Sequence, residues 1–254
     1  MRGWWREIAG LVLPVDCGGC GLPRTALCDD CRGALCGAPP RRVRPVPEPA
    51  GLPVVHAAAP YEDAVRAVLL AHKERGALGL AGVLGQALAG AVRAGLPLSC
   101  ADVLVLVPVP SSRKALRARG HDPARRIALA ASAELRRTGT PARVAAVLRQ
   151  RRVVADQSGL GARQRLANLR GALEVGEGRG RLLEGGRVVL VDDLMTTGAS
   201  LAEAARALDA AGRAPVAEGA GDTPGAEETG FPLFAHTSAA VVAAPSLSFG
   251  INRN

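Results

Sequence analysis

The chain has 254 residues and a formal net charge of +9; 48% of its residues are hydrophobic, 22% are charged and only 2% are aromatic. This composition excludes a mainly disordered chain, a collagen-like fibre and a small disulfide-stapled toxin. The scarcity of aromatic side chains argues against domains that stack single-stranded bases on aromatic platforms. We find no convincing secretion signal or membrane span, so we expect a cytoplasmic protein whose cysteines are reduced.

Five of the six cysteines lie within the first 36 residues. Four of them form the pattern C-x2-C-x7-C-x2-C: Cys17, Cys20, Cys28 and Cys31. Two C-x2-C turns supply four thiolates to one ion, which predicts a structural zinc knuckle; an iron–sulfur centre is the alternative. Because so small a segment buries little core, the metal would supply its folding energy. We therefore assign residues 1–36 to an N-terminal unit that holds this knuckle.

Residues 37–53 contain six prolines, which predicts a stiff extended linker. The main domain then covers residues 54–254. Within it, residues 215–236 are rich in Gly, Ala and Glu without periodicity, which indicates a loop insertion.

In the main domain, short apolar runs alternate with amphipathic stretches. The apolar runs predict buried strands at Val54–Ala59, Asp102–Val109, Arg143–Leu148, Arg187–Asp192 and Ala239–Ala244. Helical periodicity predicts helices at Tyr61–His72, Leu78–Ala94, Pro123–Thr138 and Ser200–Gly212. Uninterrupted Val and Leu runs fit strands covered on both faces, and the alternation favours an α/β fold with a mostly parallel twisted sheet.

Positive charge is concentrated in residues 113–170, where 15 Lys and Arg residues stand against three acidic residues. A stretch so unbalanced, here called the basic block, indicates an anionic partner such as phosphate, nucleic acid or an acidic protein. The alternative is a solvated face with scattered arginines.

The segment 187–201 carries the most informative chemistry. A buried strand is predicted to end at Asp192 and Asp193, and a loop of small and hydroxyl residues then opens onto a helix. The loop residues are Thr196, Thr197, Gly198, Ala199 and Ser200. Ligands of open α/β sheets bind beyond the carboxyl ends of the strands, and N–H groups at a helix N-terminus cradle phosphate. Carboxylates beside such a cradle suit a phosphorylated pentose, whose hydroxyls would lie between them.

The alternative for these residues is an ordinary helix cap. We also expect Gly198 to lie at the open end of the sheet, so that its substitution would cost little folding stability.

The segment 187–201 resembles the phosphoribosyl-diphosphate (PRPP) signature of type I phosphoribosyltransferases. Over residues 11–215 the chain resembles the ComF family, the competence-protein-F-like proteins that are related to amidophosphoribosyltransferase and associated with DNA uptake. The resemblance rests on the cysteine knuckle, residues 107–113 (VPVPSSR), Arg119-Gly120, Arg149, Gln157, Arg165, Asn168 and the PRPP loop. The chain departs from the family pattern at residues 121–123 (HDP), which follow the Arg-Gly pair, and at Glu74, which stands where an aromatic residue commonly follows the lysine equivalent to Lys73.

The resemblance implies a sheet of the type I phosphoribosyltransferase kind and displacement at the anomeric carbon of PRPP, with pyrophosphate leaving. Asp192 and Asp193 would be the catalytic pair that holds the ribose hydroxyls and offsets an oxocarbenium-like cation. The loop residues named above would bind the 5-phosphate, and Mg²⁺ would bridge pyrophosphate and ribose.

Two further groups of residues are candidates for contacts with pyrophosphate or for a lid that excludes water. They are Ser112, Arg113 and Lys114 after the second predicted strand, and Arg149, Gln157 and Arg165 farther along the chain. An exposed basic turn and a surface helix are the alternatives for these two groups.

The leading hypothesis is a PRPP-binding phosphoribosyltransferase (a pentosyltransferase) that serves DNA uptake. Its expected partners are PRPP and single-stranded DNA or the DNA-uptake machinery. The second hypothesis is a non-catalytic nucleic-acid or protein adaptor that uses the zinc knuckle and the basic block, with PRPP as a regulatory ligand or absent. The absence of a glutamine-hydrolysing domain argues against amidophosphoribosyltransferase itself.

Overall fold

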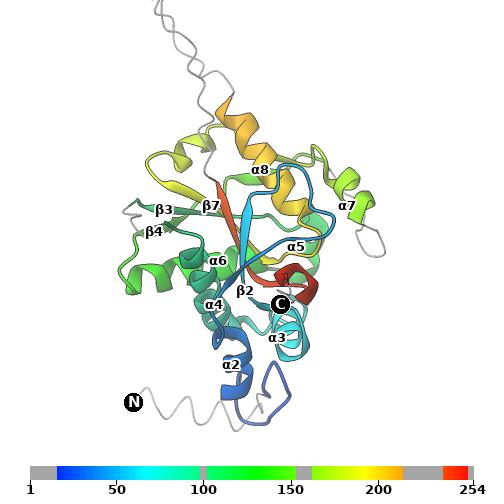
Figure 1. Cartoon of the computed structure of the whole chain (residues 1–254), viewed down its shortest axis with the longest axis vertical. Coiled ribbons are helices and arrows are strands. Elements are labelled where there is room, and N and C mark those ends of the chain that lie inside the picture. The colour runs from blue at the N-terminus through cyan, green and yellow to red at the C-terminus, as the bar shows by residue number, and fades with distance from the viewer. Residues whose placement is uncertain (1–15, 98–101, 153–161, 214–236, 251–254) are drawn as a thin grey trace, which may run out of the picture.

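A computed structural model describes residues 16–97, 102–152, 162–213 and 237–250 (Figure 1). Its centre is a six-stranded sheet with the strand order β1-β2-β8-β7-β3-β4. The strands are β1 (Arg41–Val43), β2 (Val54–Pro60), β3 (Leu104–Pro108), β4 (Ala142–Val144), β7 (Arg187–Leu194) and β8 (Ser238–Ala244). The edge strand β1 pairs antiparallel with β2, and the other neighbours in this sheet are parallel. The expected mostly parallel α/β sheet is thereby confirmed.

The central strands are buried because helices cover both faces of the sheet. In β3, Leu104 and Leu106 face one hydrophobic core, whereas Val105 and Val107 face a second one, as the two-residue period of a strand requires. The first core contains residues of α3 (Asp63–Glu74), α4 (Ala81–Ala94) and α6 (Pro123–Arg137), and the second contains residues of α8 (Ala199–Gly212). This arrangement explains why these strands read as continuous apolar runs.

The remaining described elements are smaller. They are α2 (Asp29–Cys36), α5 (Arg113–Arg119), α7 (Ala162–Leu169), the 3-10 helices η1 (Leu78–Leu80), η2 (Arg179–Leu183) and η3 (Ser246–Phe249), and an antiparallel pair of strands, β5 (Leu148–Gln150) and β6 (Leu173–Val175). The single strand expected at Arg143–Leu148 is wrong. The backbone N–H of Ala145 donates to the carbonyl of Leu106, and the chain then leaves β4. After a tight turn in which the N–H of Val147 donates to the carbonyl of Ala145, the chain enters β5 of the two-stranded sheet.

The N-terminal segment packs directly against the main domain. Leu35 of α2 is 1% exposed and belongs to the same core as α3 and α4. Residues 41–43 of the predicted linker are extended, as expected, and pair with the start of β2. The cysteine segment and the sheet therefore share one hydrophobic core.

Three features of the sequence fall outside the described residues: the lid candidate Gln157, the predicted loop insertion 215–236, and Cys100. Among the helices that the structure does describe, none combines the length and apolar character that a membrane crossing requires.

Candidate functional site

The acidic pair lies at the C-terminal end of β7, where it meets a lysine from α3. Asp193 is 5% exposed, and the ammonium of Lys73 lies 2.8 Å from its Oδ2 and 3.2 Å from its Oδ1. The backbone N–H of Asp193 also donates to Oδ1 of Asp192 over 2.8 Å. Lys73 therefore neutralises one carboxylate of the pair, 120 residues away in the sequence.

The electrostatics of this cluster separate the two carboxyl groups. Burial raises the pKa of Asp192 well above its ordinary value, the charge of Asp193 raises it further, and Lys73 offsets only part of this effect. Burial lowers the pKa of Lys73, but the charges of Asp193 and Asp192 outweigh burial and raise it. The site thus pairs a firmly charged lysine with Asp193 and leaves Asp192 with a high affinity for a proton.

The predicted phosphate loop connects this pair to α8. Gly198 precedes the first residue of α8 with φ +75°, a left-handed conformation that favours glycine. Ala199 is buried, whereas Thr196 is exposed and Thr197 and Ser200 are less accessible than Thr196. The first N–H groups of an α-helix lack partners within the helix, and its N-terminus favours negative charge. The loop therefore has the backbone and the hydroxyl groups that an anion site needs.

Gly198 is buried, so the expectation that it lies at the open end of the sheet, where a substitution costs little stability, is wrong. A Cβ at this position would lie 3.0 Å from Cδ2 of Leu52 and 3.3 Å from Cγ of Pro45. Both neighbours belong to the proline-rich linker, which turns back over the start of α8. A substitution of Gly198 thus has a folding cost as well as an effect on the loop.

Arg165 of α7 reaches the same loop. Its Nη1 donates to the hydroxyl of Thr196 over 3.2 Å, and its Nε is buried without a hydrogen-bond partner in the described parts of the chain. An unpaired N–H group of a guanidinium is costly to bury. The structure therefore brings one lid candidate to the phosphate loop.

The other lid and pyrophosphate candidates lie on two neighbouring segments. Ser112 caps α5 by accepting from the backbone N–H of Ala115, and Nη2 of Arg113 donates to the carbonyl of Gln150 over 3.4 Å. Lys114 is exposed. Arg149 on β5 forms an ion pair of 2.8 Å with Glu174 on β6. Arg113 thus joins α5 to the two-stranded β5–β6 sheet, whereas Arg149 is engaged within that sheet.

Sequence reasoning missed how α3 is attached to the site. Glu74 accepts two hydrogen bonds from Arg119, from Nε at 2.9 Å and from Nη2 at 2.6 Å. The ring of His121 contacts the carbonyl oxygens of His72 and Arg119 at 3.2 and 3.1 Å. In the sequence, Glu74 stands out only as a departure from a family pattern, and no local spacing signals a pair between residues 45 positions apart.

The four knuckle cysteines form a second site. Their sulfur atoms all lie within 4.8 Å of one another, which is a metal-binding geometry. Burial raises the pKa of the Cys17 thiol, but backbone N–H groups of Cys20, Cys28 and Gly19 outweigh burial and lower it to about 6. Cys17 is therefore readily a thiolate, the form that binds metal.

Cys36 is not part of this sulfur cluster. Its Sγ lies 4.0 Å from the carbonyl oxygen of Val83 on α4. The cluster with metal-binding geometry therefore consists of the four cysteines of the sequence motif.

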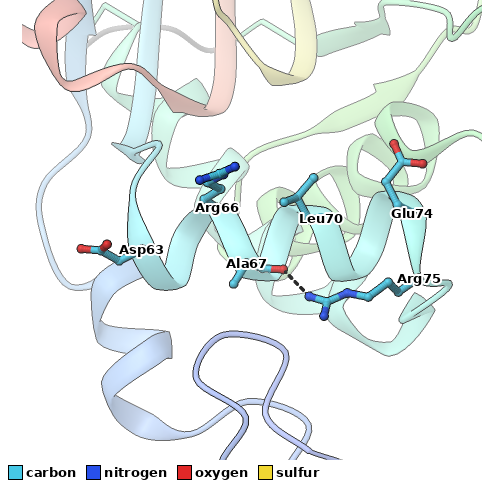
Figure 2. A pocket seen from close by; sticks show the side chains of 6 residues that line it. All are labelled: Asp63, Arg66, Ala67, Leu70, Glu74 and Arg75. Atoms are coloured by element: carbon cyan, nitrogen blue, oxygen red, sulfur yellow. Dashed lines mark hydrogen bonds between the residues drawn. The ribbon is translucent and has the colours of Figure 1, made fainter.

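A pocket of about 500 Å³ lies along the exposed side of α3 (Figure 2). It is lined by Asp63, Arg66, Ala67, Leu70, Glu74 and Arg75. Neither carboxylate of the acidic pair lines it, and its charges are mixed. No residue of the predicted phosphate loop lines it either, so this pocket is separate from both.

The acidic pair, the hydroxyl loop and Arg165 together offer acceptors for hydroxyl groups next to donors for an anion. These residues could bind one ligand that carries both hydroxyl groups and an anionic group. The sequence matches no known protein-family description, and a comparison with curated proteins finds no significant relative.

Proposed function

We propose that this chain is a phosphoribosyltransferase-like protein of ComF type, with a sheet of the type I phosphoribosyltransferase kind. It would bind PRPP, transfer the 5-phosphoribosyl group with release of pyrophosphate, and act in DNA uptake. The observation that carries the proposal is the placement of the Asp192–Asp193 pair and the hydroxyl loop on one strand–loop–helix unit, with Arg165 against the loop.

The reaction breaks the bond between the anomeric carbon of the ribose and the pyrophosphate oxygen, and an acceptor nucleophile forms the new bond at that carbon. The transition state resembles an oxocarbenium ion, so a nearby carboxylate stabilises it more than it stabilises the ground state. Asp193 would accept a hydrogen bond from one ribose hydroxyl, and Asp192 would accept a hydrogen bond from the other ribose hydroxyl. The loop and Arg165 would hold the 5-phosphate and thereby fix the distance of the sugar from the carboxylates.

Mg²⁺ suits this donor set, because carboxylate oxygens and substrate phosphates are the ligands it prefers. When bound with PRPP, it would offset the negative charge of the leaving pyrophosphate. Of the acidic pair, Asp192 is the residue that would hold it, since both oxygens of Asp193 contact Lys73.

The knuckle would hold structural zinc, because four thiolates complete a tetrahedral set with no open position for a reactant. Zinc would then contribute to folding rather than to chemistry.

The direct test is isothermal titration of the purified protein with PRPP in the presence of Mg²⁺. Ribose 5-phosphate is the matched probe for the loop and the acidic pair without the pyrophosphate, which it lacks. A screen for pyrophosphate release with bases, amines and single-stranded DNA as acceptors would then identify the nucleophile. If the protein binds neither PRPP nor ribose 5-phosphate, the proposal is overturned.

The variant Asp193→Asn separates the carboxylate contribution from that of the loop. A hydrogen bond to a charged group contributes about 1.5–3 kcal/mol, so affinity for PRPP should fall by roughly 10- to 150-fold. Because this change also leaves Lys73 without its partner, the double variant with Lys73→Met serves as the folding control. If both variants fold and bind PRPP as the parent does, the acidic pair is only part of a helix cap.

The adaptor hypothesis is favoured by one observation, the exposure of Arg113, Lys114 and Arg117 along α5. If this part of the basic block binds single-stranded DNA, affinity must fall steeply with salt, because each phosphate contact releases counterions. Arg117→Glu should weaken binding, whereas Arg66→Glu on α3 should change it far less. A flat salt dependence would remove the support for an adaptor.

A further inference from the structure

The knuckle lies directly against α3. A Cβ on Gly18 would lie 2.8 Å from Cδ1 of Leu80, which follows α3, and 3.5 Å from Cβ of Ala71. A Cβ on Gly19 would lie 3.4 Å from Cβ of Ala64. The two glycines between the first two cysteines thus allow the knuckle to pack closely on the helix. In Figure 2 the knuckle loop runs along the side of α3 opposite to the labelled Leu70 and Glu74.

The same helix carries Lys73 to the acidic pair. Ala71 and Lys73 are two positions apart, about 200° around a helix, so they point to nearly opposite sides. Ala71 meets the knuckle on one side, and Lys73 reaches Asp193 on the other. The helix α3 therefore lies between the four cysteines and the carboxylates.

The end of α3 is held in a defined position. His72 is fully buried, and its Nδ1 lies 3.3 Å from the carbonyl oxygen of Ala77. The carbonyl of Ala71 accepts from the backbone N–H groups of both Arg75 and Ala77. A shift of α3 on the knuckle side would therefore move the turn that carries Lys73.

We propose that the metal-loaded knuckle braces α3 and so positions Lys73 on Asp193. Residues 16–28 contribute few apolar side chains, and without a metal such a segment loses its fold. Ala64, Ala71 and Leu80 then lose the surface that covers them, and the last turn of α3 opens locally. The inference concerns this contact alone and does not rest on the proposed function.

The chain offers a direct probe of this contact, because Lys73 and Lys114 are its only lysines. Lys114 is exposed on α5 and has no part in the knuckle, so it is an internal control. The protein would be labelled briefly with an amine-reactive ester, and the labelled fraction of each lysine would be measured by mass spectrometry. In the metal-loaded protein, Lys73 should react much more slowly than Lys114.

Removal of the metal with a chelator should raise the reactivity of Lys73 several-fold relative to Lys114. Asp193→Asn in the metal-loaded protein should give a similar rise, and Cys36→Ser should give none. Because chelation could unfold more than the knuckle, Gly18→Val supplies a second test. It crowds Leu80 but keeps all four cysteines, so Lys73 should become reactive while the metal content stays unchanged.

The inference is overturned if chelation leaves the helical circular dichroism and the protection of Lys73 unchanged. It is also overturned if Gly18→Val retains the metal and leaves Lys73 protected. Neither measurement uses PRPP, so a failure here is distinct from a failure to bind the sugar phosphate.

Discussion

Arg165 donates a hydrogen bond from Nη1 to the hydroxyl of Thr196, and this contact of 3.2 Å ties α7 to the loop that precedes α8. The guanidinium thus lies close to the N-terminus of a 14-residue helix, where the helix dipole is positive. Two positive groups so close together repel each other unless an anion lies between them. The contact therefore places a cation and the N–H groups of the helix N-terminus where an anion would interact favourably with both.

The first prediction concerns Arg165→Met, which keeps much of the side chain's length but removes its charge and its donors. Its affinity for ribose 5-phosphate should fall by roughly 10- to 150-fold, since a hydrogen bond to a charged group contributes about 1.5–3 kcal/mol. Isothermal titration of the parent and the variant measures this loss.

Arg137→Met is the matched control for Arg165→Met. Arg137 lies at the end of α6 and pairs with Glu134, so its loss should leave sugar-phosphate affinity unchanged. Equal losses in both variants would mean that net charge, rather than the loop contact, determines binding.

The second prediction concerns the metal. The parent should contain one zinc equivalent per chain, and Cys28→Ser should lower both the zinc content and the stability of the N-terminal segment. Cys36→Ser should keep the full equivalent, because Cys36 lies outside the sulfur cluster. Elemental analysis after gel filtration measures the zinc content of both variants. A loss of zinc in Cys36→Ser, or no loss in Cys28→Ser, would contradict the four-cysteine site.

Local patterns were enough to predict much of the sheet and of the loop. The continuous runs at residues 103–107 and 188–191 identified strands that are buried on both faces, and the four cysteines at knuckle spacing do come together. The acidic pair and the loop are adjacent in sequence, so a single stretch contained their geometry. What these predictions share is that each depends on a pattern within one stretch of about 15 residues.

The contacts that could not be predicted join distant segments. Lys73 and Asp193 are 120 residues apart, and nothing in the spacing of either one indicates the other. The cover of Gly198 by Leu52 was missed because a proline-rich stretch reads as a connector, and composition does not show that it folds back over the loop. In each case, packing between distant segments decides the environment of the residue, and no local pattern indicates it.

The third prediction uses Gly198→Ala to measure how closely the linker covers the loop. A non-glycine residue in the left-handed region costs about 1–2 kcal/mol, and the contact with Leu52 adds to this cost. Gly139→Ala is the matched control, because its φ is +87° and nothing lies within 4 Å of the added Cβ. Urea denaturation should therefore show a larger loss of unfolding free energy for Gly198→Ala than for Gly139→Ala.

The loss of unfolding free energy caused by Gly198→Ala should be smaller when it is measured against Leu52→Ala than against the parent, since the shorter side chain relieves the crowding. Equal losses for both glycines would mean that the linker leaves room at the loop, and the described cover would then have no energetic consequence.

The fourth prediction follows from the raised pKa of Asp192, which burial and the neighbouring Asp193 cause. Between the pKa of the unfolded chain and the higher pKa of the folded protein, the folded protein holds a proton that the unfolded chain has released. The free energy of unfolding therefore falls as pH rises through this interval, which begins at the ordinary range of an aspartate. The variant Asp192→Asn replaces this carboxyl with an amide that cannot titrate but keeps an oxygen to accept from the N–H of Asp193.

Asp192→Asn should consequently lose less stability than the parent as pH rises above the ordinary aspartate range, and it should be at least as stable at pH 8. Urea denaturation at a series of pH values measures both curves, and Asp102→Asn, at an exposed position before β3, corrects for the loss of one charge. Asp193→Asn should instead lower the stability at pH 8, because it leaves Lys73 without its carboxylate. Parallel curves for Asp192→Asn and the parent would mean that both carboxyl groups are ionised in the folded protein. Lys73 would then have to balance two charges, and the division of roles between Asp192 and Asp193 would be wrong.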